Sequence, residues 1–278
     1  MRVLAYYGTN DIRDEEWPKP KKLQSGEARV EVRAVTLGEN DRRDYLSGAW
    51  KAPSVIGRAG AGLVTEAGES GLSVGQPVVV WLPQDAPQGL AAESVQVPLE
   101  NILPIEKALS YAEMSFLPHL AELLAVLPKA EGTSCRILGG AALKDLLNAL
   151  LPLRGYVPAK EDEEASYTVC LRADKDVLTE AIHRTKRGGK VQIISMEQDS
   201  QWDNLPLALR KGLCFNLGAV FGRELVAEAF ALFLEHGLSA AAKRLAVTWD
   251  DVEKAFPALE KESFVTLTQE SFPEPYFP

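Results

Sequence analysis

A glycine turn in the middle of the chain carries the clearest signal of ligand chemistry. An apolar segment, Cys135–Leu138, runs into Gly139-Gly140 and then into a segment with leucines at helical spacing. A strand, a glycine turn and a helix in this order open a βαβ unit whose helix N-terminus binds phosphate. The full pattern is G-x-G-x-x-G, and its second and third glycine positions hold Ala141 and Lys144. The turn therefore predicts a dinucleotide-binding type of fold with an eroded cofactor site.

Two interpretations of this region stay open. Gly139-Gly140, with Ala141 as a tolerated replacement, either approaches a cofactor pyrophosphate or forms only a tight turn at the end of a strand. A lysine farther along, Lys160, would favour NADP(H) over NAD(H) if it met a 2′-phosphate. Because Lys160 precedes the acidic run Glu161–Glu164, it is alternatively a solvated loop charge.

Bulk properties limit the class of protein. With 278 residues, 46% hydrophobic and 25% charged, the sequence predicts a globular protein of one large or two ordinary domains. A net charge of −9 argues against a nucleic-acid partner. No apolar run approaches a membrane span, and the N-terminus begins as a strand rather than a signal peptide. Three widely spaced cysteines in apolar contexts predict buried thiols in the cytoplasm.

The elements that must position these residues fall into two groups. Residues 1–100 are β-rich, with short alternating strands separated by Gly, Pro and Asp turns, as in a small barrel. From Ser110 onward, helices alternate with short apolar strands, which predicts a parallel sheet covered on both faces. The first helix, Ser110–Leu127, is expected to break near Pro118, and the helix that Asp174 caps is expected to run to about Lys186.

Several phrases, in order, resemble the medium-chain dehydrogenase/reductase superfamily, the zinc alcohol dehydrogenases and their relatives. They are Gly26-Glu27 leading into Val30–Val35, GLSVGQPVVV at Gly71–Val80, GLAAESVQVP at Gly89–Pro98, and the C-terminal segments Phe230–Gly237 and Trp249–Leu259. The resemblance implies an α/β protein with a GroES-like β-barrel catalytic domain, residues 1–114 plus 243–278. It also implies a shortened Rossmann-like doubly wound parallel sheet, residues 115–242, with any active site in the cleft between the two domains.

The same resemblance locates three positions for ligands of a catalytic zinc. They hold Gly38, Arg58 (in Gly57-Arg58-Ala59, where the family has Gly-His-Glu) and Leu117. Zinc takes thiolate, imidazole or carboxylate ligands, and none of these side chains qualifies. The family's four-cysteine structural zinc lobe is also absent from the sequence. We therefore expect no metal site and no zinc.

Zinc-free members of the superfamily, the quinone oxidoreductase-like reductases, still bind NAD(P)H. Here the acidic residue expected to bind the ribose is missing, and the chain passes from Tyr156-Val157 through Pro158-Ala159-Lys160 to the strand at Tyr167. A strand-helix unit of roughly 30 residues is therefore expected to be deleted. The weak cofactor-binding candidates are Gly139, Gly140, Ala141 and Lys160.

Candidate catalytic residues lie near the vacated metal position. The polar segment after Gly38 contributes Asn40, Asp41 and Tyr45 from what the sequence predicts to be a loop. Arg58 is expected to enter the cleft and pair with Asp41 or another acid, with a solvent-facing arginine as the alternative. His119 is either a proton donor in the cleft or a structural histidine.

Two functions from different classes remain. The first is a non-catalytic descendant that binds a small molecule in the interdomain cleft, or a partner protein. The second is a zinc-independent NAD(P)H-dependent oxidoreductase acting on a small carbonyl or activated alkene. Four features favour the first function: the metal ligands, the complete G-x-G-x-x-G pattern, the acidic residue for the ribose and one strand-helix unit are all missing from the sequence. The resemblance places the apolar segment Leu213–Val220 at the edge of the parallel sheet and implies a homodimer paired through it, since an uncovered edge invites association.

Overall fold

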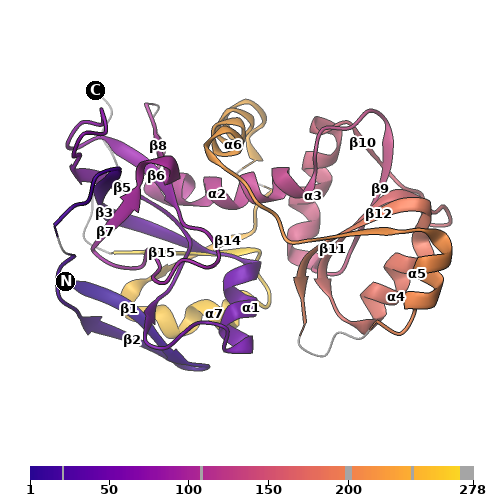
Figure 1. Cartoon of the computed structure of the whole chain (residues 1–278), viewed down its shortest axis with the longest axis horizontal. Coiled ribbons are helices and arrows are strands. Elements are labelled where there is room, and N and C mark those ends of the chain that lie inside the picture. The colour runs from indigo at the N-terminus through magenta and orange to yellow at the C-terminus, as the bar shows by residue number, and fades with distance from the viewer. Residues whose placement is uncertain (21, 107–108, 198–201, 239–240, 270–278) are drawn as a thin grey trace. The chain divides into compact units, whose positions relative to one another are not determined.

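The structure is a computed structural model that describes residues 1–20, 22–106, 109–197, 202–238 and 241–269 (Figure 1). The chain forms two compact units. Unit 1 comprises the described residues of Met1–Ala121, Phe221–Ser239 and Arg244–Pro278, and unit 2 comprises those of Glu122–Val220 and Ala240–Lys243. None of the described helices is long and apolar enough to cross a membrane.

Unit 1 is built mainly from antiparallel strands. A seven-stranded sheet has the order β14-β15-β3-β5-β6-β8, with β7 paired to β3, and a three-stranded sheet has the order β2-β1-β4. The strands are β1 (Arg2–Gly8), β2 (Asp11–Glu16), β3 (Glu27–Leu37), β4 (Ser54–Val55), β5 (Ala59–Glu66), β6 (Pro77–Trp81), β7 (Ser94–Pro98), β8 (Ile102–Pro104), β14 (Arg244–Thr248) and β15 (Phe264–Thr268). The expected GroES-like antiparallel region is thereby confirmed.

Side chains along β3, the longest described strand of this sheet, alternate between buried and partly buried positions. In β3, Val30, Val32 and Ala34 are completely buried, whereas the intervening arginines and glutamate are only partly buried. A side chain would not fit at Gly62 in the neighbouring strand, because its Cβ would lie 2.0 Å from the carbonyl oxygen of Glu31. The two strands therefore bulge past each other there, which bends the sheet.

Four helices belong wholly or partly to the described part of unit 1, and one of them, α2, continues into unit 2. They are α1 (Glu39–Ser47), the first part of α2 (Tyr111–Val126), α6 (Arg223–His236) and α7 (Ala255–Ala258), with 3₁₀ turns η1 (Leu99–Asn101) and η3 (Trp249–Lys254). Helix α2 begins with a reciprocal cap between Ser110 and Glu113. The expected break near Pro118 is wrong, because α2 continues through this residue. Fully buried neighbours, including Phe116 and Leu120, hold both turns in place.

Unit 2 contains a five-stranded sheet in which all paired strands are parallel, in the order β10-β9-β11-β12-β13. Its elements are β9 (Thr133–Leu138), α3 (Ala141–Leu153), β10 (Tyr156–Pro158), β11 (Ala165–Ala173), α4 (Lys175–Arg184), β12 (Thr185–Met196), α5 (Leu205–Lys211) and β13 (Cys214–Leu217). The common dinucleotide-binding sheet has the order 3-2-1-4-5-6. With β9 as strand 1, this sheet has the order 2-1-4-5-6 and lacks strand 3.

The segment that replaces the missing strand-helix unit crosses β9 directly. Residues 159–164 form a loop without helix. The guanidinium of Arg136 donates to the carbonyl oxygens of Lys160 and Glu163, at 2.5 and 2.6 Å. One arginine on β9 therefore fixes the loop that the deletion created.

Several boundaries differ from the sequence-based expectation. Helix α4 ends at Arg184 rather than near Lys186, because β12 begins at Thr185. Helix α6, which the sequence analysis placed with the second domain, belongs to unit 1, where Phe233 packs against Phe116. Cys214 is exposed rather than buried, because it lies on the edge strand β13. The Pro-rich tail, Phe272–Pro278, lies outside the described residues.

Candidate functional site

Gly38, the first position that the resemblance assigns to a metal ligand, lies against a side chain from α2. A Cβ on Gly38 would lie 2.8 Å from Cε1 and 2.9 Å from Nδ1 of His119. Gly38 is the N-cap of α1, so it is the turn before α1 that contacts the imidazole of His119. The space that a ligand side chain at position 38 would need is therefore occupied by an aromatic ring.

His119 is held in this place from two sides. Its Nε2 lies 2.9 Å from the carbonyl oxygen of Thr36, and its ring packs 5.2 Å from the ring of Phe264, centroid to centroid. The side chain is only 7% exposed. This is the environment expected of the structural alternative, although the ring remains beside a titratable neighbour, Asp41.

Asp41 is a buried carboxyl group with one unsatisfied oxygen. Its Oδ2 accepts a hydrogen bond from the backbone N–H of Gly38 at 2.9 Å, whereas Oδ1 has no hydrogen-bond partner among the described residues. Burial raises the pKa of Asp41, and this effect outweighs the opposing influence of His119, the Gly38 N–H and Arg58. Asp41 is thus better able to hold a proton than an exposed aspartate.

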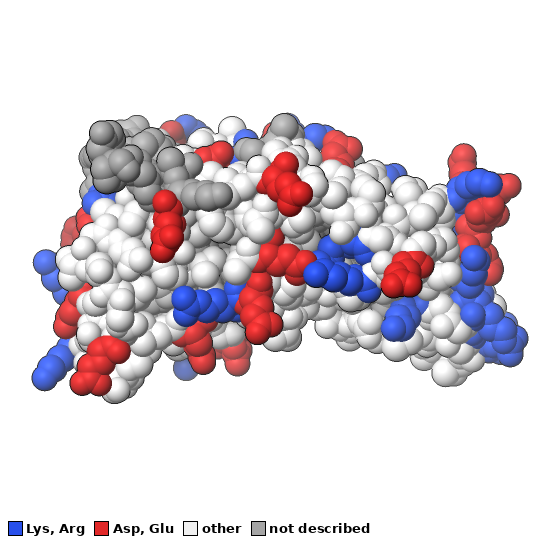
Figure 2. Space-filling view, turned by 90° about the horizontal axis from the view of Figure 1, so that it is seen from above, with Lys and Arg blue, Asp and Glu red and all other residues white. Residues whose placement is uncertain are grey.

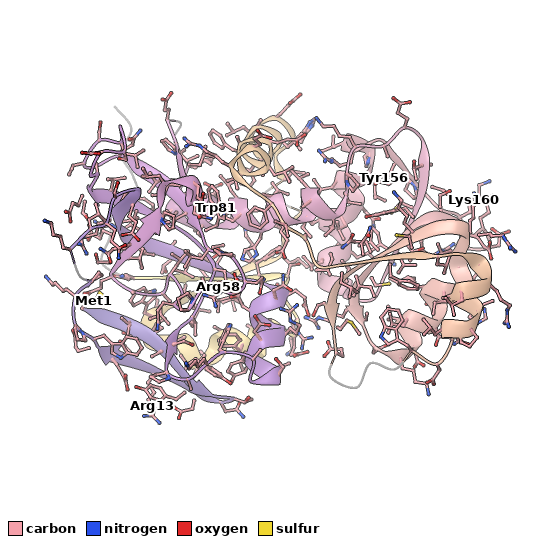
Figure 3. All side chains as sticks on the ribbon, viewed as in Figure 1. Met1, Arg13, Arg58, Trp81, Tyr156 and Lys160 are labelled. Atoms are coloured by element: carbon pink, nitrogen blue, oxygen red, sulfur yellow. The ribbon has the colours of Figure 1, made fainter. Side chains whose placement is uncertain are left out.

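Arg58 does not form the expected pair with Asp41. Its Nη1 donates to the carbonyl oxygen of Gln88 at 2.9 Å, and its buried Nε has no partner among the described residues. Arg58 is labelled among the strands of unit 1 in Figure 3. No ion pair of Arg58 occurs in the part of the chain that the structure describes. The expected pair is absent because the Arg58 side chain points to the segment 82–89, where it bonds Gln88, and not to the Asp41 carboxylate.

The third metal-ligand position offers no donor either. Leu117 is completely buried in the apolar face of α2. Within the described ranges, no group of three His, Cys, Asp or Glu side chains is arranged to hold a metal ion. The glycine, the arginine and the leucine at the three positions thus do not fit a zinc ion.

The polar segment after Gly38 is a helix, not the expected solvated loop. All the charged side chains of α1 except Arg43 are buried. Arg42 bonds Glu39 at 3.0 Å and Glu260 at 2.9 Å. At the start of the helix the Asp41 carboxylate accepts a hydrogen bond from the backbone N–H of Gly38, the N-cap, and an acid at this position was the available signal for the helix.

The other two candidates in α1 have structural partners. Asn40 accepts a hydrogen bond from Arg43 at 2.9 Å. The ring of Tyr45 stacks on Phe256 at a centroid distance of 4.0 Å, and its hydroxyl bonds Asn10. The structure thus brings together Asp41 and His119 around Gly38, while Asn40 and Tyr45 are engaged elsewhere.

The glycine turn of unit 2 is required by packing. Gly139 and Gly140 have φ values of +70° and +50°. Their Cβ atoms would lie 2.6 Å from the carbonyl oxygen of Arg172 and 2.7 Å from Cβ of Leu171. Close contact with β11 therefore explains both glycines without a ligand. Lys144, at the third glycine position of the pattern, is exposed.

The end of β10 lacks a cofactor-type acid. Lys160 is 77% exposed and pairs with Glu163 at 3.4 Å, which is the arrangement of a solvated loop charge. Nothing in this loop distinguishes NAD(H) from NADP(H). The turn and α3 would present backbone N–H groups to a pyrophosphate. The end of β10, however, provides no acidic side chain for the ribose hydroxyls.

A cavity in unit 1 was not foreseen from the sequence. It has a volume of about 760 Å³, within the size range of small-molecule sites, and the residues that line it include Trp17, Val55, Leu82, Gln88, Val95 and Asn101. Arg58 bonds the Gln88 carbonyl, and the Gln88 side chain accepts the N–H of Val55 at 2.9 Å. Two hydrogen bonds therefore fasten one wall of this cavity.

Comparisons with known proteins define the class. Residues 24–107 match the alcohol dehydrogenase GroES-like domain family. No curated protein sequence matches the chain. Among solved structures, galactitol-1-phosphate dehydrogenase from Escherichia coli is similar with a TM-score of 0.79 at 14% identity, covering 96% of this chain and 100% of that one.

Two further structures show the same relationship. 2R,3R-butanediol dehydrogenase from Bacillus subtilis has a TM-score of 0.77 at 17% identity, covering 97% of this chain and 99% of that one. A short chain alcohol dehydrogenase from Escherichia coli, complexed with NADH, has a TM-score of 0.73 at 16% identity, covering 96% and 99%. The chain has the alcohol dehydrogenase-like fold of the medium-chain dehydrogenase/reductase superfamily, which confirms the resemblance drawn from the sequence.

Proposed function

We propose that this protein is a zinc-free, alcohol dehydrogenase-like protein that binds a small organic molecule and does not catalyse dehydrogenation. The observation that carries the proposal is the imidazole of His119 in the space of the first ligand side chain, 2.8 Å from the Cβ position of Gly38. A metal could return only if this buried ring left its contacts with Thr36 and Phe264.

The cavity of unit 1 is the proposed binding site. Its lining combines apolar side chains with a few polar groups, as small-molecule sites do. Arg58, at the second metal-ligand position, bonds the wall of this cavity through Gln88. Arg58, which stands where the similar family has a zinc ligand, thus helps to hold the wall of a binding cavity in this protein.

Metal content and cofactor affinity test the loss of dehydrogenase chemistry. Elemental analysis after dialysis against a chelator should find far less than one zinc per chain. Titration with NADH and NADPH, followed by nicotinamide fluorescence, should give weak binding, because the ribose contact is missing. Near-stoichiometric zinc, or a submicromolar dissociation constant for either cofactor, would contradict the proposal.

Binding in the cavity has a separate test. Nile red, an uncharged fluorophore, should bind with increased fluorescence, and Trp17→Ser should weaken that binding. Trp202→Ser is the matched control, since Trp202 is also half-buried but belongs to unit 2. Equal effects of the two substitutions would argue against the cavity as the site.

A zinc-independent NAD(P)H-dependent reductase is the second candidate. It is favoured by the retained Gly139-Gly140 turn and by the NADH bound in the similar Escherichia coli structure. In such an enzyme the cofactor supplies the hydride, and the turn with the N-terminus of α3 would hold its pyrophosphate. Oxidation of NADPH in the presence of a quinone or an enone, followed by absorbance, would establish this function.

A further inference from the structure

A second cavity lies in unit 2, at the N-terminal ends of the parallel strands. Its volume is about 460 Å³. Thr133 and Tyr156, the first residues of β9 and β10, line it together with Tyr167 near the start of β11. The Gly139-Gly140 turn follows the carboxyl end of β9, so this cavity is at the opposite end of the strands from a dinucleotide site.

The charge of this cavity is one-sided. Lys129, Lys186, Arg187 and Lys190 line it, and no described aspartate or glutamate does. Lys186, Arg187 and Lys190 are exposed and form no ion pair with the described residues. On the face drawn in Figure 2, acidic and basic side chains are interspersed. In a chain with a net charge of −9, a cavity without acids is therefore a specific local feature.

A bulge in β12 brings two of these cations to the wall. Ala165 pairs with Thr185, but Tyr167, two residues later, pairs with Lys190, so β12 has additional residues between the two pairs. Gly188 has a φ of +71°, and a Cβ on Gly189 would lie 2.6 Å from Thr185 and 2.8 Å from the Lys186 carbonyl. The bulge thus depends on both glycines, and it displays Lys186 and Arg187.

Another lysine, Lys211, binds one carboxylate and the carbonyl end of α4. Lys211 donates to the carbonyl oxygens of Ile182 and His183, at 3.1 and 2.9 Å, at the C-terminal end of α4. It also pairs with Glu164 at 2.9 Å. Because Lys211 already binds the C-terminal carbonyl oxygens of α4 and the Glu164 carboxylate, these groups do not compete with a ligand for Lys186 and Arg187.

We propose that this cavity binds a small molecule carrying two or more phosphate groups. Lysine and arginine side chains form charge-assisted hydrogen bonds with phosphate, and arginine can donate two in parallel. The hydroxyl of Thr133 also lines the cavity. Charges farther away than a Debye length of about 8 Å are largely screened, so the local cations outweigh the negative charge of the whole chain. This site is independent of the proposed function, because neither zinc nor a dinucleotide is involved.

Calorimetric titration of the full chain with inorganic pyrophosphate tests the proposal. The variant Lys186→Gln with Arg187→Gln should bind pyrophosphate about tenfold more weakly or worse, since each charge-assisted hydrogen bond contributes strongly. The control is Lys144→Gln with Arg210→Gln, which removes the same charge from exposed positions of unit 2 that do not line the cavity. It should stay within about twofold of the parent protein.

Three outcomes would overturn the proposal: no measurable binding of pyrophosphate, equal weakening in both double variants, which would indicate unspecific attraction, or greater weakening in the control variant, which would indicate binding at the Gly139-Gly140 turn. The exposed positions of the substituted side chains make a folding defect unexpected, and circular dichroism checks it. Co-sedimentation with vesicles that contain a bisphosphorylated inositol lipid, but not with phosphatidylcholine vesicles, would identify the ligand as a lipid headgroup. Pyrophosphate binding without vesicle binding would identify a soluble molecule.

Discussion

The imidazole of His119 lies against Gly38, so close that a Cβ at position 38 would come within 2.8 Å of the ring. The two residues come from different elements, the turn before α1 and the middle of α2. Their contact means that the absence of a side chain at position 38 and the burial of the histidine depend on each other. A glycine alone would leave a void, and the ring fills it.

Gly38→Ala should destabilise the protein by about 1–3 kcal/mol, because the added methyl group overpacks a buried ring. The backbone contributes little strain, since Gly38 has an extended conformation with a φ of −132°. Urea denaturation gives the free energy of unfolding. In a His119→Ala background the same substitution should cost less than about 1 kcal/mol, because the obstructing ring is gone. An equal cost in both backgrounds would contradict the contact.

Asp41→Asn should remove a pH dependence of stability. Burial raises the folded-state pKa of Asp41 above the ordinary value of about 3.9. Its contribution therefore favours folding below about pH 4 and is lost as the pH rises through the folded-state pKa. Relative to the Asn variant, the parent protein should lose stability as the pH rises above about 4, and urea denaturation at a series of pH values measures this loss. Asp85→Asn, at an exposed position, should leave the slope unchanged.

Arg58→Met should lower the free energy of unfolding by about 1 kcal/mol, the typical contribution of one hydrogen bond. It should also speed amide hydrogen exchange in residues 82–89, since the bond to Gln88 fastens this segment. Arg210→Met, at an exposed position without a described partner, should change stability by no more than about 0.5 kcal/mol. A loss near 3 kcal/mol that disappears in an Asp41→Asn background would instead reveal the ion pair expected from the sequence.

We expect a homodimer formed through β13, the edge strand of the parallel sheet. Leu217 and Val220 are 65% and 95% exposed, and an apolar unpaired edge invites association. Light scattering should give a dimer mass at micromolar concentration, and Leu217→Lys should give the monomer. Val74→Lys is the control, because Val74 is 71% exposed and belongs to unit 1. A monomeric parent protein would refute the expectation.

The sequence predicted most strands because their signals are local. The alternation in β3 and the leucine spacing in α3 each lie within one element, and the structure has a strand and a helix where these signals occur. The missing strand of unit 2 was equally readable, since too few residues separate β10 from β11. Helix α1 was missed because its residues lack an apolar face. Its charges are buried in tertiary contacts, and one of these joins Arg42 to Glu260, a residue far away in the chain.

At the candidate site, the sequence by itself determined which chemistry the residues could not perform. Glycine, arginine and leucine at three positions lack zinc-ligand atoms in any conformation, and that conclusion needs no fold beyond the resemblance. Only the tertiary structure decided what fills the site and where Arg58 points. Steric contact between Gly38 and His119, and the bond from Arg58 to Gln88, depend on how distant segments pack. Such packing follows from the whole core, whereas the donor atoms of a side chain follow from its residue type alone.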